Sequence, residues 1–70
     1  MKVSEIRGMS TDAIRARIGD AREELMRLRF QQATGELTDF TRLRHTRRDI
    51  ARLLTILNER LQAEQMEGEK

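Results

Sequence analysis

Apolar residues recur at steps of three and four along a first long stretch of the chain. Its apolar positions are Ile14, Ile18, Ala21, Leu25 and Leu28. This is the spacing of residues that share one face of an α-helix. Ser10 is suited to cap the helix, because a serine oxygen accepts the unpaired N–H groups of a first turn. Gly35 can adopt the left-handed conformation that commonly ends a helix. The pattern predicts a helix over residues 10–34.

A second stretch repeats the same spacing closer to the C-terminus. Its predicted inward positions are Phe40, Leu43, Arg47, Ile50, Leu54, Leu57 and Leu61, and Leu53 and Ile56 widen this face. Either Thr38 or Asp39 can cap the helix, since both side chains carry an acceptor oxygen. We expect this helix to span residues 39–62 and the polar tail, residues 63–70, to fray.

The link between the two predicted helices is short, residues 35–38, and a short link joins long helices as antiparallel neighbours. Each helix would be about 35 Å long at ~1.5 Å per residue. Residues 1–9 carry Val3, Ile6 and Met9 at helical spacing, and Ser4 can cap a first turn. The sequence therefore predicts an all-α protein, residues 1–70 as a single domain: a long antiparallel two-helix hairpin with a short N-terminal helical turn.

Composition narrows the function classes. The chain has 70 residues and no cysteine, so it has neither a disulfide nor a thiolate metal site, which fits a reducing compartment. No apolar run approaches the ~20 residues of a membrane helix, and MKVSEIRG lacks the apolar stretch of a signal peptide. We find no glycine-rich phosphate loop, no HExxH motif and no nucleophile elbow. We therefore expect no catalytic residue, no cofactor and no metal site.

The net charge of +2 conceals a local excess of arginine. Residues 42–52 hold five arginines and one acid. Arg44, Arg48 and Arg52, here called the arginine stripe, fall at about 100°, 140° and 180° from Leu43 around the predicted helix. Like charges at this spacing repel one another, and a bound polyanion would relieve that repulsion. The stripe thus predicts a phosphate-binding face, the alternative being a solvated face. For His45 we expect a hydrogen bond to RNA or to solvent.

Three further positions stand out as candidates for contacts. Met26 and Phe30 lie about 120° and 160° from the apolar face of the first helix, so a two-helix hairpin leaves them open. Either they contact another molecule, or Leu37 and Phe40 fold over them. Arg29 lies close to the turn and away from the C-terminal acids, which makes it a candidate for RNA.

Arg47 is the one basic residue on the predicted apolar face. A buried unpaired guanidinium is very costly, so the side chain needs a partner or a route outward. Glu23 and Glu24 are the predicted internal partners. The other interpretation is that Arg47 emerges beside the apolar face and contacts RNA, with its aliphatic stem packing against the protein.

Two motifs carry a resemblance to a known family. They are Arg29-Phe30-Gln31 with Ala33-Thr34-Gly35, and Arg47-Arg48-Asp49-Ile50-Ala51-Arg52 with Thr55 and Asn58-Glu59. Because of these two motifs, the chain from MKVSEIR to Arg60 resembles the bacterial large-subunit ribosomal protein family numbered twenty-nine. The resemblance implies a cytoplasmic structural protein that binds ribosomal RNA near the polypeptide exit tunnel. Its neighbour there would be ribosomal protein twenty-three, and nascent-chain factors would dock nearby.

The motifs carry over residue by residue, with Arg47, Arg48 and Arg52 matching the basic motif and Arg29 with Phe30 matching the motif near the turn. Thr38-Asp39-Phe40 departs from the family pattern. Two other classes compete with this interpretation. One is a free-standing interaction module in which two hairpins pair as a four-helix homodimer. The other is a small helical enzyme resembling chorismate mutase, which would need a third helix and cations pointing inward.

Overall fold

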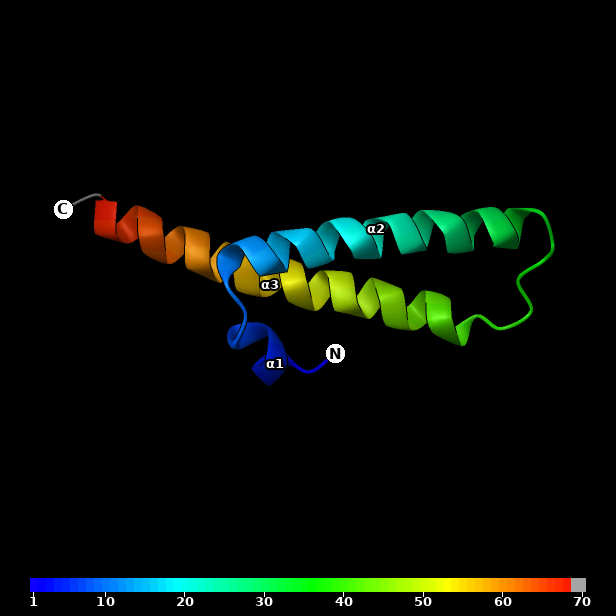
Figure 1. Cartoon of the computed structure of the whole chain (residues 1–70), viewed down its shortest axis with the longest axis horizontal. Coiled ribbons are helices and arrows are strands. Elements are labelled where there is room, and N and C mark those ends of the chain that lie inside the picture. Colours follow the sequence, from blue (N-terminus) through cyan, green and yellow to red (C-terminus); the bar gives the residue numbers. More distant parts are fainter. Residues whose placement is uncertain (69–70) are drawn as a thin grey trace.

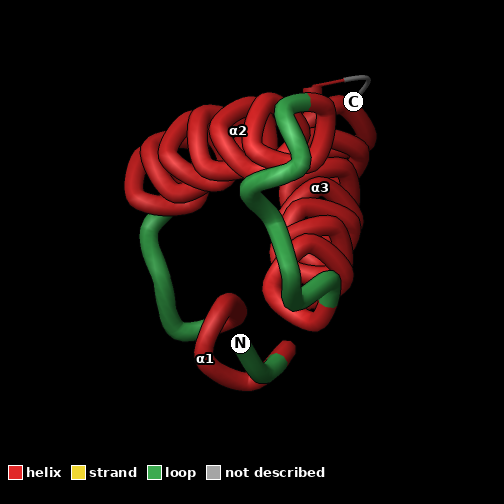
Figure 2. Tube along the Cα trace, turned by 90° about the vertical axis from the view of Figure 1, so that its right-hand side faces the viewer, coloured by secondary structure: helices red, strands yellow, loops and turns green. Residues whose placement is uncertain are grey.

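The computed structural model describes the backbone of residues 1–68 and the side chains of residues 1–65, and it confirms the all-α prediction. This part of the chain forms a short helix α1 (Val3–Arg7) and two long helices, α2 (Thr11–Ala33) and α3 (Thr41–Gly68). The long helices run antiparallel and give an elongated molecule of 54 × 20 × 14 Å (Figure 1). The α1 segment lies against α3, on a different side from α2 (Figure 2).

Polar side chains and one glycine set the ends of the long helices. The Ser10 hydroxyl accepts the Ala13 N–H at 3.1 Å, which confirms the predicted cap of α2. Gly35 has φ 80°, the left-handed conformation expected just after this helix. Before α3, the Asp39 carboxylate accepts the Thr41 N–H at 2.9 Å. The cap predicted at Ser4 is wrong, because α1 begins after Lys2 and has no side-chain cap.

Helix α3 is longer than its apolar pattern indicates. It continues to Gly68, past residue 62, where we expected the helix to end and a frayed tail to begin. Helix-forming Gln, Ala and Glu follow Leu61, and such residues extend a helix although they bury nothing. Residues 69–70 of the predicted tail lie outside the described residues.

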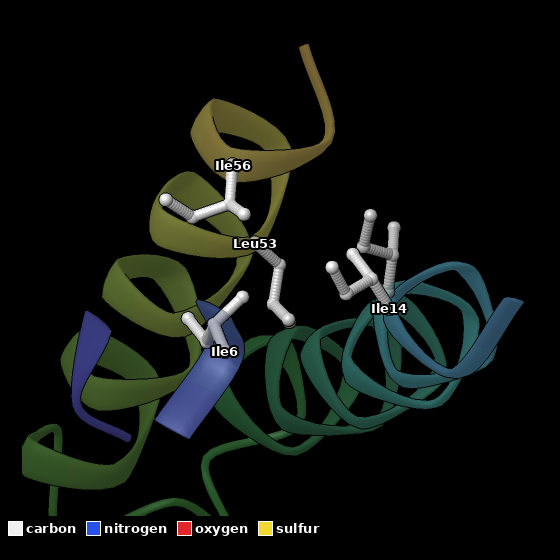
Figure 3. Packing of buried hydrophobic residues seen from close by; sticks show 5 residues of the cluster. Ile6, Ile14, Leu53 and Ile56 are labelled. Carbon is white, nitrogen blue, oxygen red and sulfur yellow. The ribbon is translucent and has the colours of Figure 1, made fainter. Parts of the chain in front are cut away.

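The main core lies where all three helices meet. Ile6 of α1, Ile14 and Ile18 of α2, and Leu53 and Ile56 of α3 form one buried cluster. Figure 3 shows Ile6 and Ile14 pointing from their two helices toward Leu53 and Ile56. Ile6 and Ile14 are fully buried, with 0% exposure. A five-residue helix therefore closes the core that two helices alone would leave open.

This arrangement corrects the predicted inward face of α3. Leu53, expected only to widen that face, is 1% exposed, whereas Leu54 is half-buried. Phe40 and Leu61, expected to face inward, are 49% and 38% exposed. For Leu53, the physical reason is that α3 has two partners, and Ile6 of α1 joins the cluster that holds Leu53 and Ile56. Phe40 precedes α3, and Leu61 follows Arg60, which contacts the first residue of α2, so both lie at the ends of the α2–α3 contact. The buried face is therefore rotated away from the one that a two-helix hairpin would use.

The core is thinner toward the α2–α3 loop. Leu28 and Leu43 are buried there, and Thr46 is buried with its hydroxyl donating to the Arg42 carbonyl at 2.9 Å. That hydrogen bond satisfies the one buried hydroxyl of the described core. On the surface nearby, Glu24 of α2 pairs with Arg42 of α3 at 2.8 Å. Fewer apolar side chains and one partly exposed ion pair hold this end together.

Candidate nucleic-acid interface

The arginine stripe is exposed along α3, as predicted. Arg44, Arg48 and Arg52 stand four residues apart, and all three are exposed. Each step of four advances about 40° around a helix, so the stripe winds as it runs. Because Arg52 donates a hydrogen bond to the Met1 carbonyl, the stripe ends beside the residues that lead into α1. The three guanidinium groups thus follow a slanted line from the back of α3 to the edge of α1.

The partners of the stripe are few. Within the described side chains, neither Arg44 nor Arg48 forms an ion pair. Arg52 Nη1 donates to the Met1 carbonyl at 2.7 Å. Asp49, the one acid among these arginines, lies 3.2 Å from the Met1 amine. The stripe therefore has donors left for an anion such as phosphate, which guanidinium groups bind in a bidentate manner.

Of the two interpretations of Arg47, the inward placement with an internal partner is wrong, and the emergence of its side chain beside the apolar face agrees with the structure. Its side chain is exposed, because the buried face of α3 is rotated toward α1. Glu24, one of its two expected partners, pairs instead with Arg42 and with Arg27, each at 2.8 Å. No ion pair of Arg47 occurs among the described side chains. Arg47 thus lies on the surface of α3 beside the stripe and needs no internal partner.

His45 is a helical neighbour of the stripe, three residues before Arg48, and it borders a groove between the long helices. It is exposed and lines a surface groove of about 600 Å³, together with Asp49 and Thr46 of α3 and residues of α2. Asp39, at the same groove, has a lowered pKa because its carboxylate accepts hydrogen bonds from the backbone and the hydroxyl of Thr41. Arg44 and His45 add smaller electrostatic contributions in the same direction.

The three remaining candidates lie on the other long helix. Met26 and Phe30 are 72% and 68% exposed, so Leu37 and Phe40 do not cover them. They line a shallow apolar depression with Glu23 and Arg27. Arg29 is exposed on the same helix. The structure therefore separates an arginine face on α3 from an apolar patch, Met26 and Phe30, on α2.

Sequence reasoning missed the polar contacts that α3 makes with α1 and with the start of α2. The Arg7 guanidinium lies 3.3 Å from the Glu59 carboxylate. Arg60 donates to the Arg7 carbonyl at 3.1 Å and to the Thr11 hydroxyl at 3.4 Å. The spacing of Val3, Ile6 and Met9 indicated a packed turn, but no local pattern shows which partner such a short turn packs against.

Metal-binding and membrane-spanning features are absent from the described part of the chain. Its side chains contain no cluster of three His, Cys, Asp or Glu residues able to hold a metal ion. Over residues 1–68, no helix combines the length and the apolar character needed to cross a bilayer.

The described fold and surface define a small helical-hairpin protein with an exposed arginine face and a separate apolar patch. Residues 4–60 match the model of a family described as Ribosomal L29 protein. The chain is 51% identical over 59 residues to the large ribosomal subunit protein uL29 of Desulfatibacillum aliphaticivorans, covering 84% of this chain and 95% of that protein. It is 52% identical over 60 residues to the large ribosomal subunit protein uL29 of Roseiflexus castenholzii, covering 86% of this chain and 91% of that protein.

The chain belongs to the Ribosomal L29 protein family. This confirms the resemblance drawn from the two motifs. The family is a structural one, so the chain is a ribosomal protein and not an enzyme. The enzyme alternative also required cations pointing inward, and Arg47, its one candidate, is exposed.

Proposed function

We propose that this chain is a structural constituent of the large ribosomal subunit that binds ribosomal RNA through the outer face of α3, near the polypeptide exit tunnel. Its RNA-binding residues on α3 are Arg44, His45, Arg47, Arg48 and Arg52, and Arg29 of α2 adds one more. The relatives are large-subunit proteins by name, which supports a place in that cytoplasmic particle. The position near the exit tunnel is supported only by the resemblance of the motifs.

One observation carries the RNA-binding part of this proposal. The arginine stripe is exposed, and Arg44 and Arg48 have no carboxylate partner among the described side chains. A solvated helix surface normally intersperses both signs of charge, and unrelieved like charges four residues apart destabilise a helix. Phosphate groups arranged along an RNA strand would remove the repulsion and accept the unused donors.

The test replaces the three stripe arginines with Gln and compares them with arginines elsewhere. A triple variant, Arg44→Gln, Arg48→Gln and Arg52→Gln, should bind large-subunit ribosomal RNA more weakly and with a flatter salt dependence. The slope of log K against log salt should fall by roughly 0.9 for each duplex phosphate that the variant no longer neutralises. The matched control replaces exposed Arg15, Arg17 and Arg22 of α2, which removes the same charge. Equally weakened binding in the two variants would contradict a specific stripe.

The apolar patch supplies the protein-contacting part of the proposal. Met26 and Phe30 would contact a neighbouring protein in the subunit, which the resemblance gives as ribosomal protein twenty-three, with nascent-chain factors docking close by. An apolar pair this exposed is the usual mark of a binding surface. Phe30→Ser should leave the melting curve of the free protein unchanged but weaken retention in washed large subunits. The matched control is Leu61→Ser, a partly exposed apolar residue on α3.

The exposed patch also favours a second candidate, the four-helix homodimer. In that case two copies would bury Met26 and Phe30 against each other. Sedimentation of the free protein separates the candidates, because the ribosomal proposal expects a monomer whose RNA binding weakens with salt. A dimer that persists in high salt and dissociates on Phe30→Ser would support the homodimer instead.

A further inference from the structure

The α1 segment carries cations that lie against both acids in the middle of α3. Between Thr41 and Arg60, the acids of α3 are Asp49 and Glu59. The Met1 amine lies 3.2 Å from the Asp49 carboxylate, and the Arg7 guanidinium lies 3.3 Å from the Glu59 carboxylate. Each negative charge on this length of α3 therefore has a positive group of the N-terminal segment beside it.

These ion pairs are not what holds α1 in place. The Arg7 and Glu59 side chains are 58% and 50% exposed, and exposed pairs contribute little to stability. The anchor is Ile6, which is fully buried against Leu53 and Ile56. Because an apolar side chain provides the attachment, the charges of α1 are available for an electrostatic role: they offset carboxylates that would otherwise repel phosphates bound to α3.

The N-terminal segment that carries α1, residues 1–7, also fixes one member of the arginine stripe. Arg52 Nη1 donates to the Met1 carbonyl at 2.7 Å, which uses one of the five N–H donors of a guanidinium. The remaining donors stay free for an anion. A side chain that is already held in place loses less conformational freedom when it binds. The stripe ends at α1, and exposed Lys2 adds a further cation there.

We propose that α1 is part of the RNA-binding surface. Together with Met1 and Lys2, which precede it, α1 masks Asp49 and Glu59, holds Arg52 in position and extends the positive surface from the arginine stripe to Arg7. This inference rests on the proposed RNA binding by α3 and adds a second element to that site.

The first test detaches α1 without changing any charge. Ile6→Ala removes its anchor, and Leu43→Ala is the matched control, since Leu43 is a buried residue of α3 far from α1. Both variants are compared at a temperature where circular dichroism shows them folded. Their affinity for large-subunit ribosomal RNA is then measured over a range of salt concentrations. Ile6→Ala should bind about tenfold more weakly than Leu43→Ala, with a salt slope lower by about one to two. Equal affinities would overturn the proposal.

The second test keeps the core intact and changes surface charge. Arg7→Gln exposes the Glu59 charge, whereas Arg15→Gln removes the same charge from an exposed position of α2. Arg7→Gln should weaken RNA binding several-fold more than Arg15→Gln, and adding Glu59→Gln should restore most of that difference. Equal effects of the two arginine variants would count against the role of α1. If the stripe variants bind RNA normally, the proposed function itself fails. If the stripe variants lose RNA binding but the α1 variants bind RNA normally, then α3 binds RNA without the help of α1.

Discussion

The two ends of the hairpin are built differently, although the same two long helices form both. At the end called here the closed end, α1 packs against α3, and Ile6, Ile14 and Leu53 are at most 1% exposed. At the other end, called the turn end, no third helix covers the α2–α3 pair within the described residues (Figure 1). Apolar side chains stay open to solvent there, among them Met26 and Phe30 at 72% and 68% exposure.

This difference shows what a very short helix can contribute. Two packed helices shield only the strip between them, so the remaining apolar side chains face water. A third element need supply only one well-placed apolar residue, here Ile6, to complete a buried cluster. The turn end lacks that third element, and its exposed pair is the surface assigned above to a protein partner. The closed end thus provides stability, while the turn end leaves an apolar surface for contact.

The largest expected effect separates neighbouring leucines of the closed end. Leu53 is 1% exposed and Leu54 is half-buried. Leu53→Ala should lower the free energy of unfolding by about 2–5 kcal/mol, as cavities in packed cores do, and Leu54→Ala should lower it by clearly less. Thermal and urea unfolding followed by circular dichroism measure both. A larger decrease in stability for Leu54→Ala than for Leu53→Ala would contradict the structure and support the inward face that the apolar spacing alone predicts.

Two glycine substitutions sharpen the comparison with effects of opposite sign. Gly35, at the turn end, has φ 80°, so Gly35→Ala should destabilise the protein by about 1–2 kcal/mol. Gly19 lies inside α2, and a Cβ there meets nothing within 4 Å. Gly19→Ala should therefore stabilise the protein by about 1 kcal/mol, the difference in helix propensity. The midpoints of urea unfolding measure both changes in stability. Two changes of the same sign would contradict the left-handed conformation of Gly35 or the open helical position of Gly19.

The smallest expected effect is a pH dependence at the turn end. Hydrogen bonds from Thr41 lower the pKa of Asp39, so the folded protein binds this proton less readily than the unfolded chain does. The resulting stabilisation is complete above the ordinary aspartate pKa of about 3.9 and fades as the pH falls through the lower folded value. Asp39→Asn should therefore reduce stability slightly at neutral pH and weaken its decline in acid. Chemical unfolding at several pH values, with Asp12→Asn as control, measures this. If stability declined identically in acid for both variants, Asp39 would make no contribution to the pH dependence of stability.

Most of the fold follows from local rules. The inward positions of α2 were predicted because this helix buries one face against one long partner, and Ile14, Ile18 and Leu28 are all buried. The cap at Ser10 and the left-handed Gly35 were predicted because each depends on only a few neighbouring residues. The motifs also identified the family, which the match over residues 4–60 confirms.

The error in the predicted inward face of α3 originates in the docking of α1. Which helix a five-residue segment packs against depends on contacts between residues about fifty apart, such as Arg52 with Met1 and Arg60 with Arg7. Periodicity within α3 carries no information about them. That unseen partner rotated the buried face and left Arg47 on the surface. The exposure of the stripe was predicted nevertheless, because the positions opposite a helix's buried face remain exposed over a broad arc.

The most direct test of the difference between the two ends is native-state hydrogen exchange on the free protein. Leu53 and Ile14 represent the closed end, and Leu28 and Thr46 the turn end; all four are buried helix residues. If α1 closes the core, the closed-end amides should exchange at least about tenfold more slowly, because only global unfolding opens them. In Ile6→Ala that difference should disappear. Equal protection at both ends of the unmodified protein, or slower exchange at Leu28 and Thr46, would contradict the account.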